Sequence, residues 1–351
     1  MNPYILTIST LSLIMGTLIA ISSFHWLLTW VGLEINTFAI IPLMAKENNP
    51  RAMEAAIKYF IIQSIATAIL LFAIIYNAWN LGQWNIQQNY LPQTIMLIMG
   101  ALALKLGLAP MHSWFPEIMQ GLSLQTGLIL STWQKIAPLS LMLQLPVINP
   151  MCSTLLGLLS MLMGSWGILN QTQTRKILGY SSITNLGTMM MVIQYTPSLT
   201  FLAFNMYVIL AIAIYSMLAY SQMMSINSLS TSWTKSPIIS ATAPLILLSS
   251  AGLPPLTGFL PKWMILLELA KQGAVLAAMG MMLSALMSLY VYLRIFYSMT
   301  LTTPPNNLPS MLSWRVNYMK PKLLLAIFCM FSLWLLPLSL TILTIFIFPE
   351  I

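Results

Sequence analysis

Long apolar stretches alternate with short polar segments along almost the whole chain. As a helix, about 20 apolar residues span the hydrocarbon core of a bilayer, and this length divides the sequence into eleven segments. We therefore expect an all-α, polytopic membrane protein with about 11 transmembrane helices. The expected spans are residues 3–23, 24–45, 54–78, 93–116, 121–146, 150–170, 176–195, 198–223, 238–270, 274–298 and 323–348.

Two of these spans contain helix-breaking residues. The fourth span holds Pro110 and Pro116, and the ninth holds the pair Pro254-Pro255. Proline lacks the backbone N–H and clashes with the preceding turn of a helix. We expect each of the two spans to be one interrupted helix.

The two breaker segments are similar to each other. Residues 107–117 (GLAPMHSWFPE) align without gaps with residues 252–262 (GLPPLTGFLPK) and share the glycine, the leucine and both prolines. The segments lie five spans apart, an odd number, so equivalent helices would run in opposite directions, as in ion transporters built from inverted repeats. We expect two inverted five-helix repeats, residues 1–149 and 150–300, followed by a loop and a C-terminal transmembrane helix in residues 301–351.

The composition agrees with a membrane protein and excludes several other classes. The chain is 58% hydrophobic and 6% charged, whereas about 25% of residues are charged in an average soluble domain. That excludes a soluble globule, a secreted disulfide scaffold and a disordered chain. The net charge is +8, but the cations are too dispersed for a nucleic-acid-binding stripe, so a membrane surface explains them better.

Few residues are available for a metal or redox site. The chain has two cysteines, Cys152 and Cys329, and two histidines, His25 and His112. These cannot make a zinc or iron-sulfur ligand set, and a haem held by both histidines would require them to meet. No glycine-rich nucleotide motif is present. We therefore expect neither a metal nor a cofactor in this chain.

The cations predict the orientation, because Lys and Arg collect on the side of the membrane that is not translocated. With the N-terminus inside, only Lys271 lies near an outside end, so the C-terminus is expected outside. The sequence opens with an apolar run and no Arg-rich leader, so nothing indicates import or secretion as a soluble chain. With 28 methionines and no aspartate, the composition is what we expect of a very hydrophobic product synthesised beside its own membrane. Ten cations lie near inside ends, namely Lys46, Arg51, Lys58, Arg175, Lys176, Lys235, Arg294, Arg315, Lys320 and Lys322.

Four charged residues lie deep in the apolar spans: Glu34, Lys105, Lys135 and Lys262. An ionisable group at the bilayer centre costs about 2.5–3.5 kcal/mol on insertion scales and usually marks a conduction path or a buried pair. A structural ion pair, for example Glu34 with Lys105, is one interpretation. Three lysines cannot all be neutralised by one glutamate, however, so the set favours a proton relay. His112, in the first interruption, fits a relay and a structural role equally well.

The other charged and aromatic residues have simpler interpretations. Glu54 and Lys58 are spaced for an i,i+4 pair. Glu268, Lys271 and Arg294 lie near span ends, where surface pairing or extension toward the membrane surface explains them. The tryptophans interpreted as membrane-interface anchors are Trp26, Trp79, Trp84 and Trp233.

Five motifs occur in order along the chain. They are residues 30–34 (WVGLE), 105–117 (KLGLAPMHSWFPE), 133–135 (WQK), 170–178 (NQTQTRKIL) and 252–263 (GLPPLTGFLPKW). Together they resemble the chain 2 family of antiporter-like subunits in mitochondrial NADH:ubiquinone oxidoreductase, respiratory complex I. The resemblance covers essentially the whole chain. It is closest to the short animal form, which is similar to the fourteen-helix subunits without their first three helices.

The resemblance assigns roles to individual positions. Glu34 matches the glutamate of the family's coupling pair, Lys105 its lysine partner, and Lys135 the central connecting lysine. Lys262 matches the relay residue of the second interrupted helix, and His112 the histidine beside the first break. One position departs from the pattern. Asn185 stands where many relatives have a histidine, and asparagine cannot carry a proton, which leaves it a water-bridging role.

The implied function is proton translocation in the membrane arm, coupled to quinone reduction elsewhere in the enzyme. FMN, iron-sulfur clusters and ubiquinone are expected in other subunits. The expected partners are the other membrane-arm subunits and phospholipid, with cardiolipin as a candidate, and no nucleic acid. The expected location is the mitochondrial inner membrane, with the N-terminus in the matrix and the C-terminus in the intermembrane space. Two alternatives stay open: a stand-alone monovalent cation/proton antiporter, and a non-conducting structural subunit.

Overall fold

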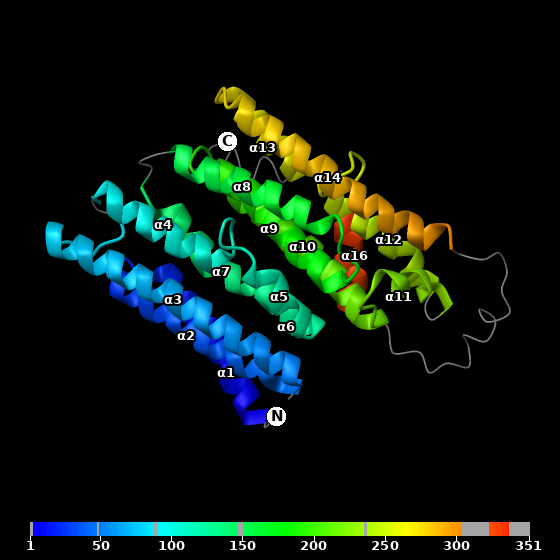
Figure 1. The fold of residues 1–351 in the computed structure, drawn as a ribbon, viewed down its shortest axis with the longest axis horizontal. Helices are drawn as coiled ribbons and strands as arrows, with labels where there is room; N and C mark the ends of the chain where they lie inside the picture. Colours follow the sequence, from blue (N-terminus) through cyan, green and yellow to red (C-terminus); the bar gives the residue numbers. More distant parts are fainter. Residues whose placement is uncertain are drawn as a thin grey trace. The chain divides into compact units, whose positions relative to one another are not determined.

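Helices make up the regular structure of the chain (Figure 1). The computed structural model describes residues 3–47, 49–87, 90–146, 150–234, 237–302 and 323–336, and these contain no β-strand, only two isolated bridges. The all-α fold class is confirmed. The helices that are long and apolar enough to cross a membrane are α1 (Pro3–Ser22), α2 (Trp26–Met44), α3 (Pro50–Leu81), α8 (Pro150–Ile168), α10 (Pro197–Ser221) and α14 (Val275–Thr300).

The remaining helices are shorter or less apolar. They are α4 (Pro92–Leu106), α5 (Trp114–Gly121), α6 (Leu124–Ser131), α7 (Trp133–Gln144), α9 (Thr174–Val192), α11 (Ile226–Ser230), α12 (Pro237–Ala251), α13 (Phe259–Lys271) and α16 (Leu323–Trp334), with single 3-10 turns at Ala45–Glu47 and Ser232–Thr234. Several predicted features lie outside the described residues: Lys235, Arg315, Lys320, Lys322 and residues 337–348 of the last predicted span.

The chain divides into two compact units, Met1–Leu156 and Gly157–Ile351. In the first unit, α1 packs along α2, and α3 contacts α2, α4 and α5. The α1 and α2 helices approach each other closely at Gly16 and Gly32, where a Cβ on Gly16 would lie 2.9 Å from the carbonyl oxygen of Gly32. Small residues let membrane helices approach this closely, and packing then holds them together.

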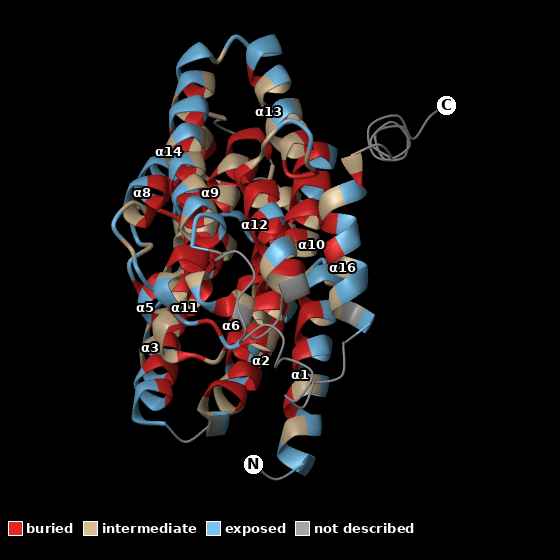
Figure 2. Ribbon diagram, turned by 90° about the vertical axis from the view of Figure 1, so that its right-hand side faces the viewer, coloured by how far each residue is buried: buried red, intermediate tan, exposed pale blue. Residues whose placement is uncertain are grey.

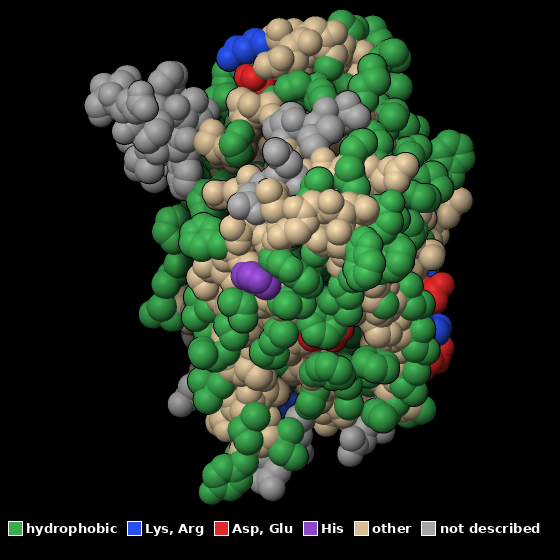
Figure 3. Space-filling view, turned by 90° about the vertical axis from the view of Figure 1, so that its left-hand side faces the viewer, with side chains coloured by type: hydrophobic (Ala, Val, Ile, Leu, Met, Phe, Trp, Pro, Cys, Tyr) green, Lys and Arg blue, Asp and Glu red, His purple; other side chains and the backbone are tan. Residues whose placement is uncertain are grey.

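In the second unit, α10 is the central helix. It contacts α9, α12, α13 and α16. In an apolar stretch of 18 residues of α10, 67% of the residues are buried, compared with 28% in the corresponding stretch of α1 in the first unit. Figure 2 colours most of α10 as buried, while the outer face of α14 is exposed. The face drawn in Figure 3 shows many hydrophobic side chains and few charged ones, which suits contact with lipid.

Both predicted interruptions are confirmed. The α4 helix ends at Leu106, before Gly107 (φ 76°), and α12 ends at Ala251, before Gly252 (φ 86°). Glycine suits both positions because a left-handed backbone carries no Cβ penalty there. The chain resumes as α5 at Trp114 and as α13 at Phe259. Both helix ends and both restarts are offset by 145 residues, the same offset that aligns the two sequence segments.

Two local predictions were wrong. The predicted fifth span, 121–146, is not continuous, because α6 ends and α7 begins on either side of Thr132. Lys135 is therefore near the start of α7 rather than in the middle of an unbroken helix. Trp26 is 1% exposed and donates from Nε1 to the Tyr90 hydroxyl at 2.7 Å, so it packs inside the first unit and is not an interface anchor.

Candidate functional sites at the interrupted helices

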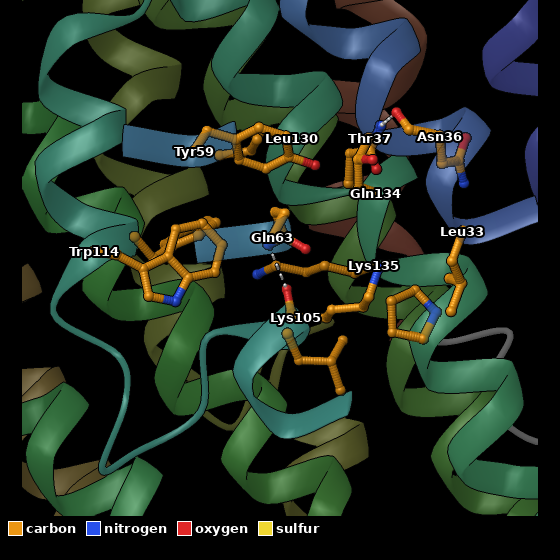
Figure 4. A pocket seen from close by; sticks show the side chains of 13 residues that line it. Leu33, Asn36, Thr37, Tyr59, Gln63, Lys105, Trp114, Leu130, Gln134 and Lys135 are labelled. Carbon is orange, nitrogen blue, oxygen red and sulfur yellow. Dashed lines mark hydrogen bonds between the residues drawn. The ribbon is translucent and has the colours of Figure 1, made fainter. Parts of the chain in front are cut away.

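Lys105 and Lys135 line the same cavity in the first unit (Figure 4). The cavity has a volume of about 20 Å³, and a water molecule needs roughly 10–15 Å³. The Trp114 indole N–H is buried at its wall and has no acceptor among the described residues, which favours a polar occupant. The lining residues are Leu33, Asn36, Thr37, Tyr59, Gln63, Lys105, Leu106, Trp114, Phe115, Leu130, Gln134, Lys135 and Pro138.

The interrupted helix positions Lys105. It lies in the last turn of α4 and is 7% exposed, and Gln63 on α3 donates from Nε2 to its carbonyl oxygen at 3.4 Å. The unsatisfied carbonyls at a helix C-terminus carry partial negative charge. They favour an ammonium group in this turn, where the apolar surroundings alone would disfavour it.

Lys135 approaches the cavity from α7 and is 2% exposed. Its Nζ lies 4.6 Å from the centre of the Phe115 ring on α5. The face of an aromatic ring attracts a cation, by about 2 kcal/mol where water is excluded. The α5 helix, which follows the first break, therefore places an aromatic ring where it stabilises a charged Lys135 on α7.

Glu34 lies in the middle of α2, half-buried and one helical turn from the cavity wall. The Thr37 hydroxyl, at that wall, donates to the Glu34 carbonyl oxygen at 2.8 Å and to Glu34 Oε2 at 3.2 Å, so its one hydrogen is shared between the two acceptors. The ion pairs of the described residues do not include one between Glu34 and Lys105, so the simple structural-pair interpretation is not observed.

His112 is in the loop between α4 and α5. The ring is half-buried, with Nδ1 3.2 Å from the carbonyl oxygen of Pro110. It is not among the residues that line the Lys105–Lys135 cavity. The first break thus brings Lys105 and Lys135 together, with Glu34 behind Thr37, and leaves His112 beside this group.

Lys262 occupies the second interruption, in the first turn of α13. Its Nζ donates to the carbonyl oxygen of Ala251, the last residue of α12, at 2.6 Å. A Cβ on Gly252 would lie 2.9 Å from Cδ and 3.2 Å from Nζ of Lys262. The lysine thus rests against the C-terminus of the broken helix because residue 252 has no side chain. Lys105 lies in the C-terminal turn of α4, before the first break, and Lys262 reaches the C-terminus of α12 from α13, after the second break. Each lysine is therefore next to the partial negative charge at a helix C-terminus.

Two small cavities meet at Lys262. One has a volume of about 30 Å³ and the other about 10 Å³, and both are lined by Lys262, Asn185 and Thr188. Tyr207 and Ser250 are among the other residues of the larger cavity. The smaller one is completed by Thr184, Met281, Ser284, Ala285 and Ser288.

The predicted surface pairs are present. Lys58 Nζ lies 2.8 Å from Glu54 Oε1 and 3.3 Å from Glu117 Oε2, so it joins α3 to α5 as well as forming the expected i,i+4 pair. Lys271 Nζ lies 3.6 Å from Glu268 Oε2. Arg294 donates to the carbonyl oxygen of Leu169 at 3.5 Å.

Most polar, uncharged residues of the two sites were missed by the sequence analysis. Thr37, Gln63 and Gln134 line the first cavity, and Ser284 and Ser288 line the smaller cavity beside Lys262. Their signal was helical spacing. Thr37 lies at i+3 from Glu34, and Ser288 lies at i+4 from Ser284, so each pair shares a helix face. Among the described residues, no group of three or more His, Cys, Asp or Glu side chains is placed to hold a metal ion.

Comparison with known families supports the resemblance drawn from the five motifs. Residues 23–288 match the family described as NADH:quinone oxidoreductase/Mrp antiporter, TM, and residues 289–343 match the NADH dehydrogenase subunit 2 C-terminus. Three sequence relatives are NADH-ubiquinone oxidoreductase chain 2 from Salmo salar, Tetraodon nigroviridis and Squalus acanthias. They are 54%, 52% and 50% identical, over 97%, 99% and 97% of this chain and 97%, 99% and 99% of theirs.

Solved structures share the fold at lower identity. A chain of respiratory complex I from Thermus thermophilus with bound aureothin superposes with a TM-score of 0.78 at 24% identity, covering 95% of this chain and 80% of that one. A chain of the Mrp complex from Dietzia sp. DQ12-45-1b gives a TM-score of 0.76 at 16% identity, covering 83% and 59%.

Proposed function

The chain belongs to the NADH-ubiquinone oxidoreductase chain 2 family, and we propose that it acts as an antiporter-like, proton-translocating subunit in the membrane arm of that enzyme. Its expected partners are the other subunits of the complex. FMN, the iron-sulfur clusters and ubiquinone belong to those subunits. This chain contributes a route for protons that is coupled to quinone reduction elsewhere.

One observation carries the proposal: Lys105 and Lys135 converge on one cavity of water size inside apolar helices. Buried lysines are costly and in membrane proteins usually serve a conduction path. Both lysines are buried among apolar helices, and the Phe115 ring lies where it can stabilise a cation at Lys135. Small changes in spacing or hydration then move a proton onto or off each lysine.

The proton relay comprises Glu34, Lys105, Lys135, Lys262 and His112. Glu34 sets the charge state of Lys105, and Lys105 exchanges a proton with Lys135 through water in the shared cavity. Lys262 performs the same chemistry at the second break. His112 lies in the loop of the first interruption, between α4 and α5, with Nδ1 3.2 Å from the carbonyl oxygen of Pro110, and its imidazole can donate or accept a proton there.

The proposed architecture has eleven spans arranged as two inverted five-helix halves, residues 1–149 and 150–300, with residues 301–351 adding the C-terminal helix. The constant offset of 145 residues at both breaks supports it. The cation distribution supports an N-terminus in the matrix and a C-terminus in the intermembrane space. The location is the mitochondrial inner membrane, in contact with phospholipid.

The test uses Lys105→Met and Glu34→Gln in the assembled oxidoreductase, in sealed membrane vesicles. We expect both variants to assemble but to move fewer protons per NADH oxidised. Lys46→Met is the matched control, because Lys46 is exposed in the turn after α2. An unchanged proton-to-electron ratio in both variants would overturn the relay and leave the non-conducting structural subunit. Isolation of an active chain without flavin and iron-sulfur partners would instead favour the stand-alone antiporter.

A further inference from the structure

The smaller cavity beside Lys262 has an unusual chemical lining. Four hydroxyl side chains face it, Thr184 and Thr188 from α9 and Ser284 and Ser288 from α14. Within the second unit they form a polar lining between α9 and α14. We call these four residues the hydroxyl cage.

Every hydroxyl of the cage has its hydrogen engaged by its own helix. Thr184 and Thr188 donate to the carbonyl oxygens of Ser181 and Asn185, both at 2.7 Å. Ser284 and Ser288 donate to the carbonyl oxygens three residues earlier, both at 2.8 Å. A hydroxyl has one hydrogen and two lone pairs. The four oxygens therefore remain as acceptors, and the cage suits a group that only donates.

Lys262 is such a donor and lies at the edge of the cage. Its ammonium carries three N–H donors and no acceptor, and the residue lines both the larger and the smaller cavity. In the structure Nζ is held at the carbonyl oxygen of Ala251. The smaller cavity, at about 10 Å³, approaches the volume that one water-sized group needs.

We propose that the hydroxyl cage is a second docking site for the Lys262 ammonium, so that the lysine moves between the C-terminus of α12 and the cage. This inference rests on the proposed proton relay and adds positioning residues to it. In the cage, four acceptors stabilise the charged form. At Ala251, a neutral amine still donates one N–H to the carbonyl oxygen, while its proton passes to water in the larger cavity. The movement thus carries one proton from one cavity to the other.

Substitutions of Thr184 can test the docking site, because the shape of the side chain and its hydroxyl group can be changed separately. Its methyl group packs close to Gly164 of α8, where a Cβ would lie 2.7 Å from Thr184 Cγ2. Thr184→Val keeps the branched shape and removes the oxygen, and Thr184→Ser keeps the oxygen and removes the methyl group. A merely structural role predicts that valine is tolerated better, whereas a docking role predicts that serine is.

The experiment measures protons moved per NADH oxidised by the assembled complex in sealed vesicles. We expect Thr184→Val combined with Ser288→Ala to lower the ratio, and Thr184→Ser to retain it. Ser298→Ala is the matched control, because Ser298 is also on α14 and donates to its own helix at 2.7 Å but lies outside the cage. A normal ratio in the Thr184→Val, Ser288→Ala double variant would overturn the proposed docking site. An equally low ratio in Ser298→Ala would also overturn it.

The Lys262→Met variant distinguishes failure of the proposed docking site from failure of the proton relay. If Lys262→Met lowers the ratio and the cage variants do not, the relay stands and the second docking site is wrong. If Lys262→Met itself leaves the ratio unchanged, Lys262 is not part of the relay and the cage has no function in it.

Discussion

The ammonium of Lys135 lies over the ring of Phe115, with Nζ 4.6 Å from the ring centre. The two residues come from different segments, Lys135 from α7 and Phe115 from the half-helix α5 that follows the first break. A displacement of α5 therefore changes the stability of the charge on Lys135 without any movement of α7. Phe115 therefore makes the electrostatic surroundings of Lys135 depend on the position of α5.

Phe115→Leu should weaken that dependence. Leucine fills most of the buried site, which is 1% exposed in the structure, but it removes a cation–π attraction of about 1–2 kcal/mol. We expect a several-fold lower rate of coupled NADH oxidation with normal assembly. Phe115→Tyr keeps the ring and serves as the control. Equal rates for Leu, Tyr and the unmodified protein would show that the ring acts only in packing.

The hydrogen bond from Thr37 to the Glu34 carboxylate gives a second prediction. Thr37→Val keeps the shape at the cavity wall and removes a hydrogen bond that is shared between the carbonyl and carboxylate oxygens of Glu34, which contributes about 1 kcal/mol. The Glu34 carboxylate is then less stable, and its effect on Lys105 weakens. We expect a lower proton-to-electron ratio for Thr37→Val, measured in sealed vesicles. Thr37→Ser, which retains the hydroxyl, should preserve the ratio, and the opposite order would contradict this role.

The sequence could predict both interruptions because their causes are local. A glycine that adopts positive φ and prolines that cannot donate end α4 and α12 whatever surrounds them. The break at Thr132 had no such signal, since neither glycine nor proline adjoins it, and Pro138 lies six residues further on. The residues on either side of Thr132 carry no comparable local signal, so the sequence did not predict this break.

The candidate site followed the same division. A charged residue within an apolar span can be recognised from the sequence alone, so the sequence identified Glu34, Lys105, Lys135 and Lys262. Which of them meet was not visible. The Thr37 hydroxyl connects Glu34 to the cavity wall, and the hydroxyl cage arises from two helices that are distant in sequence. Serine and threonine are common in helices, so they become informative only when packing places them together.

The bridge from Lys58 to Glu117 should contribute little, although it joins α3 to α5. Both side chains are about half exposed, at 44% and 57%, and exposed ion pairs are weakened by solvent and salt. Lys58 also retains Glu54 as a partner in the Glu117→Gln variant. We expect assembly, turnover and proton stoichiometry all to remain normal. Loss of stoichiometry in Glu117→Gln would instead place this charge in the proton route.

The last prediction compares two glycines that both have a positive φ angle. Gly82 (φ 67°) ends α3 and Gly252 (φ 86°) follows α12. An alanine in the left-handed region costs about 1–2 kcal/mol at either position. At Gly82 a Cβ meets no heavy atom within 4 Å, whereas at Gly252 it meets Lys262 Cδ at 2.9 Å and Nζ at 3.2 Å. Only the second substitution forces Lys262 away from the carbonyl oxygen of Ala251.

We therefore expect Gly82→Ala and Gly252→Ala to lower the thermal stability of the assembled complex by similar amounts. Proton stoichiometry should fall only in Gly252→Ala, because only there does the lysine lose its place at the helix C-terminus. Thermal inactivation and protons per NADH, measured on the same vesicles, separate the two effects. A normal proton stoichiometry in Gly252→Ala would mean that the hydrogen bond from Lys262 to the carbonyl oxygen of Ala251 is not required for proton movement. A reduced stoichiometry in Gly82→Ala would mean that backbone strain alone uncouples the enzyme.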